Sequence, residues 1–249
     1  RTMRKLASVP LPTQLISAKA IADANSIRLN DILEEQTGLL MVPDFGGVEG
    51  LQMQGLDSQY NLILIDGVPL VGRSAGTFDL SRVTVGNIKQ IEIVKGPSSS
   101  LYGNEALAGV VNIITQTPKT GFGGRFYYRG GNYSSNDLST DLRYKKDKLG
   151  LYAFVNRFSN EGYDLVDSDD VSTVEPFHNY TFNTKINYEF SEKVKLFVSG
   201  RLYRQVQDNV ASASYNGESQ IDEWNFHSKL ELKFNEKWDN QFAFYTTTY

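Results

Sequence analysis

The sequence of 249 residues has no cysteine, only two histidines and no long hydrophobic run. Without cysteine the chain cannot form disulfide bonds, Cys-based zinc sites or thiol nucleophiles. No stretch approaches the roughly 20 consecutive apolar residues that a membrane-spanning helix needs, which excludes a helical membrane protein. Basic residues do not predominate either, because 25 Lys and Arg stand against 29 Asp and Glu, a net charge of −4. This balance disfavours a nucleic-acid partner.

Aromatic residues and glycine are plentiful instead: the chain has 14 Tyr, 14 Phe, 2 Trp and 21 Gly. Such a composition favours β structure. The pattern of the chain changes near residue 118, which predicts two domains, 1–118 and 119–249.

The segment 1–118 has the pattern of a small α/β domain. Leu11–Ser17 is predicted as a strand, and Ser17 is also the expected N-cap of a helix that ends near Ala24. A second helix is predicted in "IRLNDILEEQTG", where Gly38 provides the stop. Asp66-Gly67 after the apolar run "NLILI" indicates a tight hairpin. Further strands are predicted in "IKQIEIVKGP" and "GVVNIITQ".

The segment 119–249 alternates strictly between apolar and polar residues. In "YTFNTKINYEF" (180–190) the aromatic and aliphatic side chains share one face, and Thr, Asn, Lys and Glu share the other. Alternation sustained over nine or more residues indicates long strands with one apolar and one polar face. Seven strands are predicted, near 121–130, 136–146, 149–158, 180–190, 193–206, 222–235 and 237–249.

The predicted connections between these strands alternate in length. Those after the second, fourth and sixth strands are short ("KDK", "SEK", "NEK"). Those after the first, third and fifth are longer or looser ("GNYSSN", "NEGYDLVDSDDVSTVEPFHN", "QDNVASASYNGESQ"). Short turns at one end and long polar loops at the other are typical of an outer-membrane barrel. The alternative is a soluble sandwich or lipocalin-like barrel whose apolar face points inward.

Ordered motifs in the first domain resemble the plug domain of TonB-dependent outer-membrane receptors. They are Gly55-Leu56, Asp66 to Pro69, Ile91 to Pro97, Leu101 to Gly103 and Gly109 to Thr115. The resemblance implies a plug domain followed by transmembrane antiparallel strands, here the first seven of an incomplete 22-stranded β-barrel. It also implies that the chain is an N-terminal portion of the receptor, with an energy-coupling TonB box before Arg1.

Two positions depart from the family pattern. The family usually has Arg before the Gly-Leu motif and before the Gly-Pro motif, where this chain has Gln54 and Lys95. In the family these basic residues help to tie the plug to glutamates of the barrel wall. We therefore expect Gln54 and Lys95 to be plug–barrel contact positions with weaker electrostatic coupling, because Gln carries no charge and Lys lacks bidentate geometry.

The resemblance implies that plug loops contact the ligand. The candidate loops are "MVPDFGGVEG" and "VGRSAGTF", both Gly-rich and both between predicted strands. The residues expected to bind substrate are Phe45, Arg73, Ser74 and Phe78. The alternative is that these loops are simple turns.

The loop "EGYDLVDSDD" is rich in carboxylates. Asp164, Asp167 and Asp169 provide the hard oxygen ligands that Ca²⁺ prefers, and the segment is similar to the acidic loop near which cobalamin receptors of this family bind calcium. The alternative is a solvated acidic loop. His178, late in the same connection, is a candidate haem ligand, although a lone loop histidine is more often only exposed.

No combination of nucleophile, base and acid suggests catalysis, so we expect a protein that is not an enzyme. The resemblance implies energy-coupled uptake of an iron chelate, such as a siderophore or haem, across the bacterial outer membrane. The implied partners are the outer-membrane lipid and the TonB-ExbB-ExbD inner-membrane complex. No cofactor is required, although calcium is possible. The alternatives are a cobalamin receptor with a calcium-binding loop and a non-transporting surface receptor or adhesin.

Overall fold

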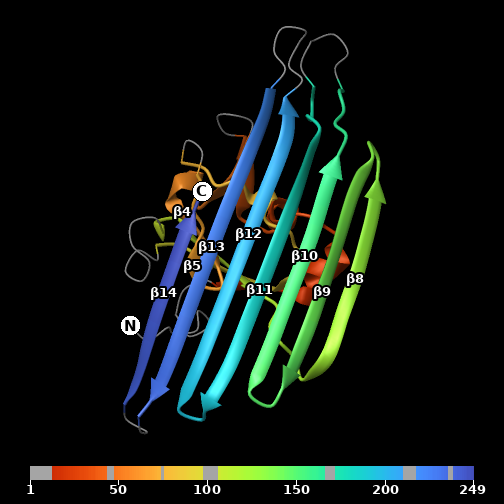
Figure 1. Ribbon diagram of the computed structural model, residues 1–249. Coiled ribbons are helices and arrows are strands. Elements are labelled where there is room, and N and C mark those ends of the chain that lie inside the picture. The colour runs from red at the N-terminus through yellow and green to blue at the C-terminus, as the bar shows by residue number, and fades with distance from the viewer. Residues whose placement is uncertain are drawn as a thin grey trace. The chain divides into compact units, whose positions relative to one another are not determined.

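The computed structural model describes residues 13–43, 48–73, 76–97, 106–165, 172–209, 217–234 and 238–249. The chain divides into two compact units, Arg1–Gln116 and Thr117–Tyr249, called here the first and the second unit. Figure 1 labels the strands of the second unit and part of the first. No helix in the described part of the chain is long and apolar enough to cross a membrane.

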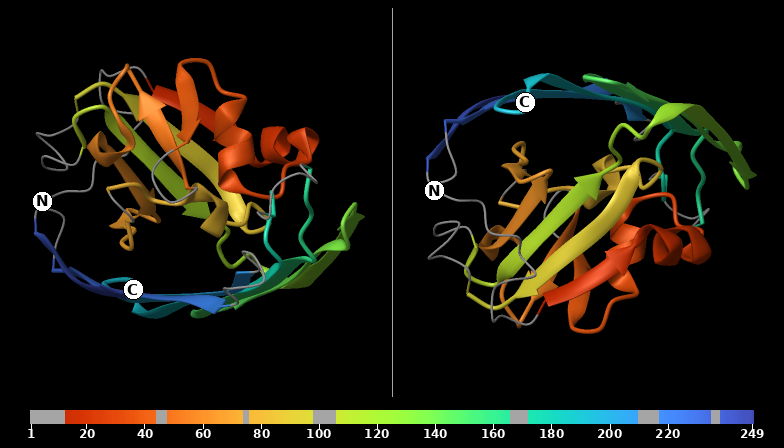
Figure 2. Two further views of the ribbon diagram at one scale, coloured as in Figure 1. Left: turned by 90° about the horizontal axis from the view of Figure 1, so that it is seen from above. Right: turned by 90° about the horizontal axis from the view of Figure 1, so that it is seen from below.

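The first unit contains a five-stranded sheet in the order β1-β6-β7-β4-β5. Strands β4 and β7 are parallel, and the other neighbouring pairs are antiparallel. Figure 2 shows β1, β6, β7 and β4 side by side, coloured red, yellow, yellow-green and orange. The bounds are β1 Thr13–Ser17, β4 Asn61–Ile65, β5 Val68–Pro69, β6 Ile88–Lys95 and β7 Gly109–Thr115. A separate hairpin joins β2 (Leu39–Pro43) to β3 (Glu49–Met53).

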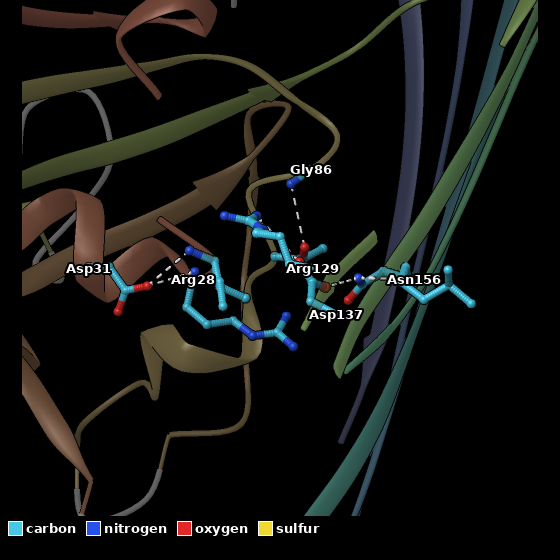
Figure 3. Close-up of polar contacts among 9 residues, drawn as sticks. Arg28, Asp31, Gly86, Arg129, Asp137 and Asn156 are labelled. Carbon is cyan, nitrogen blue, oxygen red and sulfur yellow. Dashed lines mark hydrogen bonds and ion pairs between the residues drawn. The ribbon is translucent and has the colours of Figure 1, made fainter. Parts of the chain in front are cut away.

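Two short helices follow β1, and local capping explains their starts. α1 (Ala18–Ala24) begins as predicted at Ser17, whose hydroxyl accepts a hydrogen bond from the N–H of Ala20 at 3.2 Å. α2 (Leu29–Glu34) begins where the Asp31 carboxylate accepts from the N–H groups of Ile27 and Arg28, at 3.1 and 3.0 Å (Figure 3). The second helix is shorter than predicted, because the chain turns after Glu34 towards Gly38, which has φ of +76°.

A hydrophobic cluster lies on each face of the sheet of the first unit. Three side chains of α2, Leu29, Ile32 and Leu33, join a large core cluster with the strand residues Ile91 and Ile113. A second, smaller cluster consists of Leu62, Leu64, Val94, Ala106 and Val110. Side chains of β4 therefore enter both clusters, which explains why its sequence "NLILI" is a continuous apolar run.

The second unit is a seven-stranded antiparallel meander, as predicted, with each strand beside its sequence neighbours (Figure 1). The strands are β8 Gly121–Gly131, β9 Ser135–Lys146, β10 Leu149–Asn160, β11 Phe177–Ser191, β12 Val194–Asn209, β13 Gly217–Lys233 and β14 Asp239–Thr248.

One predicted long connection of the second unit is wrong. The β8–β9 turn contains only residues 132–134, because Tyr133 and Ser134 adopt positive φ of 56° and 53° and reverse the chain at once. The β9–β10 and β11–β12 turns have two residues each, as tight as predicted, and the β10–β11 connection is long.

The apolar face of this sheet is the exposed one. On β11, Phe182 and Ile186 are each 38% exposed, whereas Thr181 is 1% and Lys185 is 4% exposed. The register continues the apolar face across the sheet, since Ile186 pairs with Leu151 on β10 and Val198 on β12. An antiparallel sheet with one continuous apolar face and one polar face has the side-chain pattern of outer-membrane barrel strands.

Candidate functional site

The first unit contains an open groove of about 320 Å³ between the β2–β3 hairpin and the 3₁₀ turn η2 (Ser58–Tyr60). The groove is lined by Val42, Pro43, Gly50, Gln52, Asp57, Ser58 and Gln59. Apart from Val42, Pro43 and Gly50, every lining residue carries a hydrogen-bonding side chain. The groove thus lies against the first of the two Gly-rich loops that the sequence indicated.

A close backbone approach at Gly50 shapes one side of the groove. A Cβ added there would lie 3.0 Å from Cβ of Ser58 and 3.3 Å from Cγ2 of Thr77, tighter than ordinary contacts. The hydroxyl oxygens of Ser58 and Thr77 are 2.6 Å apart and share a hydrogen bond. Glycine at position 50 therefore lets β3 pack directly on the η2 turn and on the second Gly-rich loop.

Arg73 holds that second loop in place. Its guanidinium donates to three backbone carbonyl oxygens: Ser58 at 3.2 Å, Gly76 at 3.0 Å and Asn61 at 2.8 Å. These acceptors belong to η2, to the loop itself and to the start of β4. The fixed fork of a guanidinium suits such simultaneous donation, which a lysine ammonium reproduces less well.

Asn61 extends the same network to β3. Its side-chain amide is buried and donates to the carbonyl of Leu51 at 2.5 Å and to the carbonyl of Asp57 at 3.4 Å. Asn61 was not identified as a site residue from the sequence. Its polar character at the start of the apolar run "NLILI" was the only available signal.

The four predicted substrate contacts have different outcomes. Arg73 lies beside the groove, but its guanidinium is engaged with backbone carbonyls. Phe78 is 4% exposed, belongs to the main core cluster and packs with its ring 4.3 Å from the Arg82 guanidinium carbon. A core position does not fit the prediction that Phe78 contacts a ligand. Phe45 and Ser74 lie outside the described residues.

The family-like motifs meet in a polar network at the β4–β5 hairpin. The Asp66 carboxylate accepts from the backbone N–H of Thr115 at 3.0 Å and from its hydroxyl at 2.7 Å. The Asn112 side chain accepts from the N–H of Gly67 at 3.1 Å and donates to Glu92 at 3.2 Å. Asp66 and Gly67 have positive φ of 51° and 81°, as the hairpin prediction required.

The two predicted plug–barrel positions have definite local roles. Gln54 is exposed and has φ of 53° in a two-residue turn with Gly55, closed by mutual hydrogen bonds between Met53 and Leu56. The Lys95 ammonium donates to the backbone carbonyl of Thr37, just after α2. Contact of either residue with a barrel wall stays a prediction.

The acidic loop is only partly described. Asp164 is exposed and its carboxylate accepts from the Thr173 hydroxyl at 3.2 Å, while Asp167 and Asp169 lie outside the described residues. Within the described ranges no three His, Asp or Glu side chains gather as a metal site. Calcium binding therefore stays a prediction.

His178 belongs to strand β11, not to the loop before it, which corrects the sequence-based placement. Its ring lies on the apolar face, 5.8 Å from the Tyr180 ring in an edge arrangement. The side chain thus points to the same side as Phe182 and Ile186. This orientation gives no support to haem ligation inside a barrel.

The polar face of the second unit carries ion pairs between and within strands. The Asp141 carboxylate lies 2.7 Å from Arg125 and 2.8 Å from Arg143, and Arg201 lies 2.7 Å from Glu223. Asp137 pairs with Arg129 at 3.3 Å and accepts from the Asn156 amide at 2.6 Å (Figure 3). This face is therefore a charged, internally paired surface, suited to a wet barrel interior.

Residues 5–110 match a family model described as the TonB-dependent Receptor Plug Domain. The structure is similar to that of a variant ferric enterobactin receptor from Pseudomonas aeruginosa, with a TM-score of 0.75 and 19% identity over 91% of this chain and 39% of that chain. It is also similar to the siderophore receptor PirA from Acinetobacter baumannii, with a TM-score of 0.78 and 18% identity over 93% of this chain and 39% of that chain.

A third similar structure is P. aeruginosa FpvA bound to a heterologous pyoverdine, with a TM-score of 0.78 and 14% identity over 96% of this chain and 34% of that chain. At these identities the likeness is one of fold. The chain spans 39% of the length of the first two receptors. The fold in common comprises an α/β domain followed by antiparallel barrel strands.

Proposed function

Since the chain is a TonB-dependent receptor plug domain followed by strands of the receptor's β-barrel, we propose that it serves energy-coupled uptake of an iron–siderophore chelate. TonB-dependent receptors are proteins of the outer membrane of Gram-negative bacteria, and the chain is therefore an outer-membrane protein. The family consists of receptors and not of enzymes. We propose that the present chain is likewise part of a receptor and not of an enzyme.

The observation that carries the proposal is the groove between the β2–β3 hairpin and η2. It offers amide, hydroxyl and carboxylate groups on a supporting network of Arg73 and Asn61, which is the kind of pre-formed polar surface that orients a small ligand. The described lining residues offer hydrogen-bonding groups, and ligand binding is the chemistry that such groups support. The relatives named above are receptors for siderophores, which favours a siderophore over haem or cobalamin.

In the proposed transport the two units have different roles. The second unit would contribute lipid-facing strands, and the first would contribute the ligand groove. Release of the ligand into the periplasm would require a conformational change of the plug domain, driven by the TonB-ExbB-ExbD complex of the inner membrane. The proposed partners of the chain are therefore the TonB-ExbB-ExbD complex and an iron chelate.

The experiment is uptake of radioactive iron from a panel of ferric siderophores by cells that carry the complete receptor as their only siderophore receptor. We expect accumulation at 37 °C that is lost when TonB is deleted or when the proton gradient is collapsed. Binding that persists without TonB, with no accumulation in either strain, would support the non-transporting receptor instead. Absence of both binding and accumulation for every chelate would overturn the proposal.

A further inference from the structure

Two arginines lie on the apolar face of the second unit. Arg157 on β10 and Arg204 on β12 each pair with Tyr180 on β11, the strand between them (Figure 1). Directly paired residues of neighbouring strands share a face, so the three side chains form one row. All three are exposed. The row lies near the strand ends from which the β10–β11 and β12–β13 connections leave.

The position of the row fits one edge of a membrane-spanning band. On β11 the same face continues from Tyr180 through Ile186 to Phe190. The ten steps from Tyr180 to Phe190 span about 33 Å along the strand, at about 3.3 Å per residue. For a strand tilted by about 35–45° this is about 25 Å along the membrane normal, the height of the apolar band of an outer-membrane barrel. The arginines therefore lie at the edge of the band that is nearer the long connections.

The surroundings of that edge favour a phosphate partner. A guanidinium at the bilayer midplane is strongly destabilising, whereas its cost becomes small at the interface. The groups that meet it there are lipid headgroups, and a guanidinium binds phosphate through parallel, charge-assisted hydrogen bonds. The longer connections of a bacterial barrel face the outside of the cell. The phosphates within reach of the row therefore belong to lipids of the outer leaflet.

Each arginine keeps a positive charge that an anion can approach. Arg157 donates through Nη1 to the Ser159 hydroxyl at 3.0 Å and through Nε to the Tyr180 hydroxyl at 3.4 Å, and both acceptors are neutral. Arg204 lies 3.6 Å from the Asp222 carboxylate in an exposed ion pair, which is a weak kind of pair. Neighbouring strands are about 4.8 Å apart, so the backbones of Arg157 and Arg204 are about 10 Å apart and both side chains can reach a phosphate above Tyr180.

Other ionisable groups of this face surround the row. His178, one row nearer the connections, has its ring 5.8 Å from the Tyr180 ring and can donate an N–H. Asp208 and Glu218 face each other two rows further towards the connections, about 13 Å along the strands. Of these three carboxylates only Asp222 lies in the row, where two guanidinium groups oppose it.

We propose that Arg157, Tyr180 and Arg204 bind the phosphate of an anionic lipid in the outer leaflet. The two guanidinium groups donate to the phosphate oxygens, and the phenol hydroxyl between them can add a third hydrogen bond. The next row towards the middle of the band is apolar and contacts the acyl chains; its residues are Val155, Phe182 and Leu202. The site belongs to the second unit alone, and it does not depend on which chelate the receptor transports.

The test places a fluorophore near the row in the complete receptor, otherwise free of cysteine. Ala153→Cys, labelled with bimane, lies on the same face two rows from Arg157, at the depth of the acyl chains. The receptor is embedded in phosphatidylcholine nanodiscs with a minor share of phosphatidic acid or phosphatidylcholine that carries brominated acyl chains, which quench the label. We expect the phosphatidic acid to associate about tenfold more strongly, since each arginine favours an anionic lipid about fivefold and Asp222 opposes it. Equal quenching by the two lipids would overturn the proposal.

Variants assign the preference to the row. Arg157→Gln combined with Arg204→Gln should bring the ratio of the two association constants close to one, whereas Asp222→Asn should raise it about threefold. Lys146→Gln removes an exposed cation from the opposite end of the same face and is the control, with an unchanged ratio expected. A ratio that stays high in the double variant would overturn the site.

Two further outcomes keep the proposal falsifiable where the double variant fails to insert. Asp222→Asn retains both arginines, and a ratio that is unchanged or lower in this variant would contradict an electrostatic preference for the anionic lipid. Inorganic phosphate in the buffer should leave the quenching unchanged. Full relief of quenching would show that the site takes free phosphate and not a lipid headgroup.

Discussion

Asp66 holds Thr115 at two points, with its carboxylate 3.0 Å from the backbone nitrogen and 2.7 Å from the hydroxyl oxygen. The contact fixes the β4–β5 hairpin to the end of β7, the last strand of the sheet in chain order. Because Asp66 also has positive φ, it combines two requirements: an acceptor side chain and tolerance of the left-handed region.

Asp66→Ala is therefore expected to lower the free energy of unfolding of the first unit by about 3 kcal/mol, since it removes two hydrogen bonds to a charged acceptor and strains the turn. Asp66→Asn keeps an acceptor and the turn conformation and should cost about 1 kcal/mol. Urea unfolding of the separately expressed segment 1–118, followed by circular dichroism, measures both. The unaltered segment should unfold cooperatively because it has its own core. A segment without a cooperative transition would contradict its independence.

Arg73→Lys is expected to weaken chelate binding about tenfold while leaving the core intact. Lysine can reach fewer of the three carbonyls, so the second Gly-rich loop and η2 lose their common support. Titration of the complete receptor with a ferric siderophore measures the affinity, and its melting temperature reports the fold. Lys19→Gln is the control, because it removes one cation from α1 and only an exposed pair with Asp23. Unaltered affinity in Arg73→Lys would show that the three hydrogen bonds of the Arg73 guanidinium do not shape the ligand surface.

The orientation of the barrel strands can be tested at two adjacent positions of β11. Ile186→Arg places a charge on the exposed apolar face and should destabilise the inserted barrel by about 2–4 kcal/mol. Asn187→Arg, on the polar face beside Lys185, should cost little. This chain has no cysteine, and single Cys substitutions in a receptor otherwise free of cysteine give a direct readout. Cys at 186 should react with a lipid-soluble thiol reagent and resist an aqueous one, and equal aqueous labelling at 186 and 187 would contradict the membrane barrel.

Arg201 and Glu223 form an ion pair on the polar face whose side chains are 6% and 0% exposed. Glu223→Gln leaves the guanidinium without its charged partner and should destabilise the barrel by about 3 kcal/mol. The neighbouring residue on the opposite face, Asp222, is 45% exposed and lies 3.6 Å from Arg204. Asp222→Asn is the control and should cost less than about 1 kcal/mol. Urea unfolding of the lipid-inserted receptor measures the free energy of unfolding of both variants. Equal losses in Glu223→Gln and Asp222→Asn would mean that burial does not set the strength of these ion pairs.

The calcium hypothesis predicts a calcium-dependent ligand affinity that requires the acidic loop. Replacing Asp164 and Asp167 by Asn removes two charges and keeps the side-chain shape, so chelation of calcium should weaken substrate binding only in the unaltered receptor. Binding curves with and without a calcium chelator measure this. Curves that coincide in both proteins would identify the loop as solvated and free of calcium.

The sequence predicted the strands of the five-stranded and the seven-stranded sheets for local reasons, but it did not predict β2 and β3, which overlap the segment taken as the first Gly-rich loop. β9 and β11 repeat the alternation of polar and apolar residues over their length, and Asp66-Gly67 indicates its turn directly. The β8–β9 turn was predicted too long because Tyr133 and Ser134 adopt positive φ, which neither residue type indicates.

The site was predicted less completely, because its key contacts join distant segments. The sequence indicated the loop of Arg73 but not the carbonyls of Ser58 and Asn61 that engage its guanidinium. Phe78 was assigned to the ligand because its loop is Gly-rich, although tertiary packing places its ring in the core. Glu92 and Asn112 have no local signal of their pairing, which arises only when β6 and β7 are in register.

The place of β1 at the edge of its sheet has a mechanical consequence. β1 is bonded to a single neighbour, β6, through the short run of pairs from Thr13–Val94 to Ser17–Gln90. A pulling force applied to the chain before Thr13 would load this edge first, while β6, β7 and β4 each keep neighbours on both sides. The first unit should therefore yield by peeling β1 from the sheet before its interior strands separate, and a force–extension measurement should record that step first.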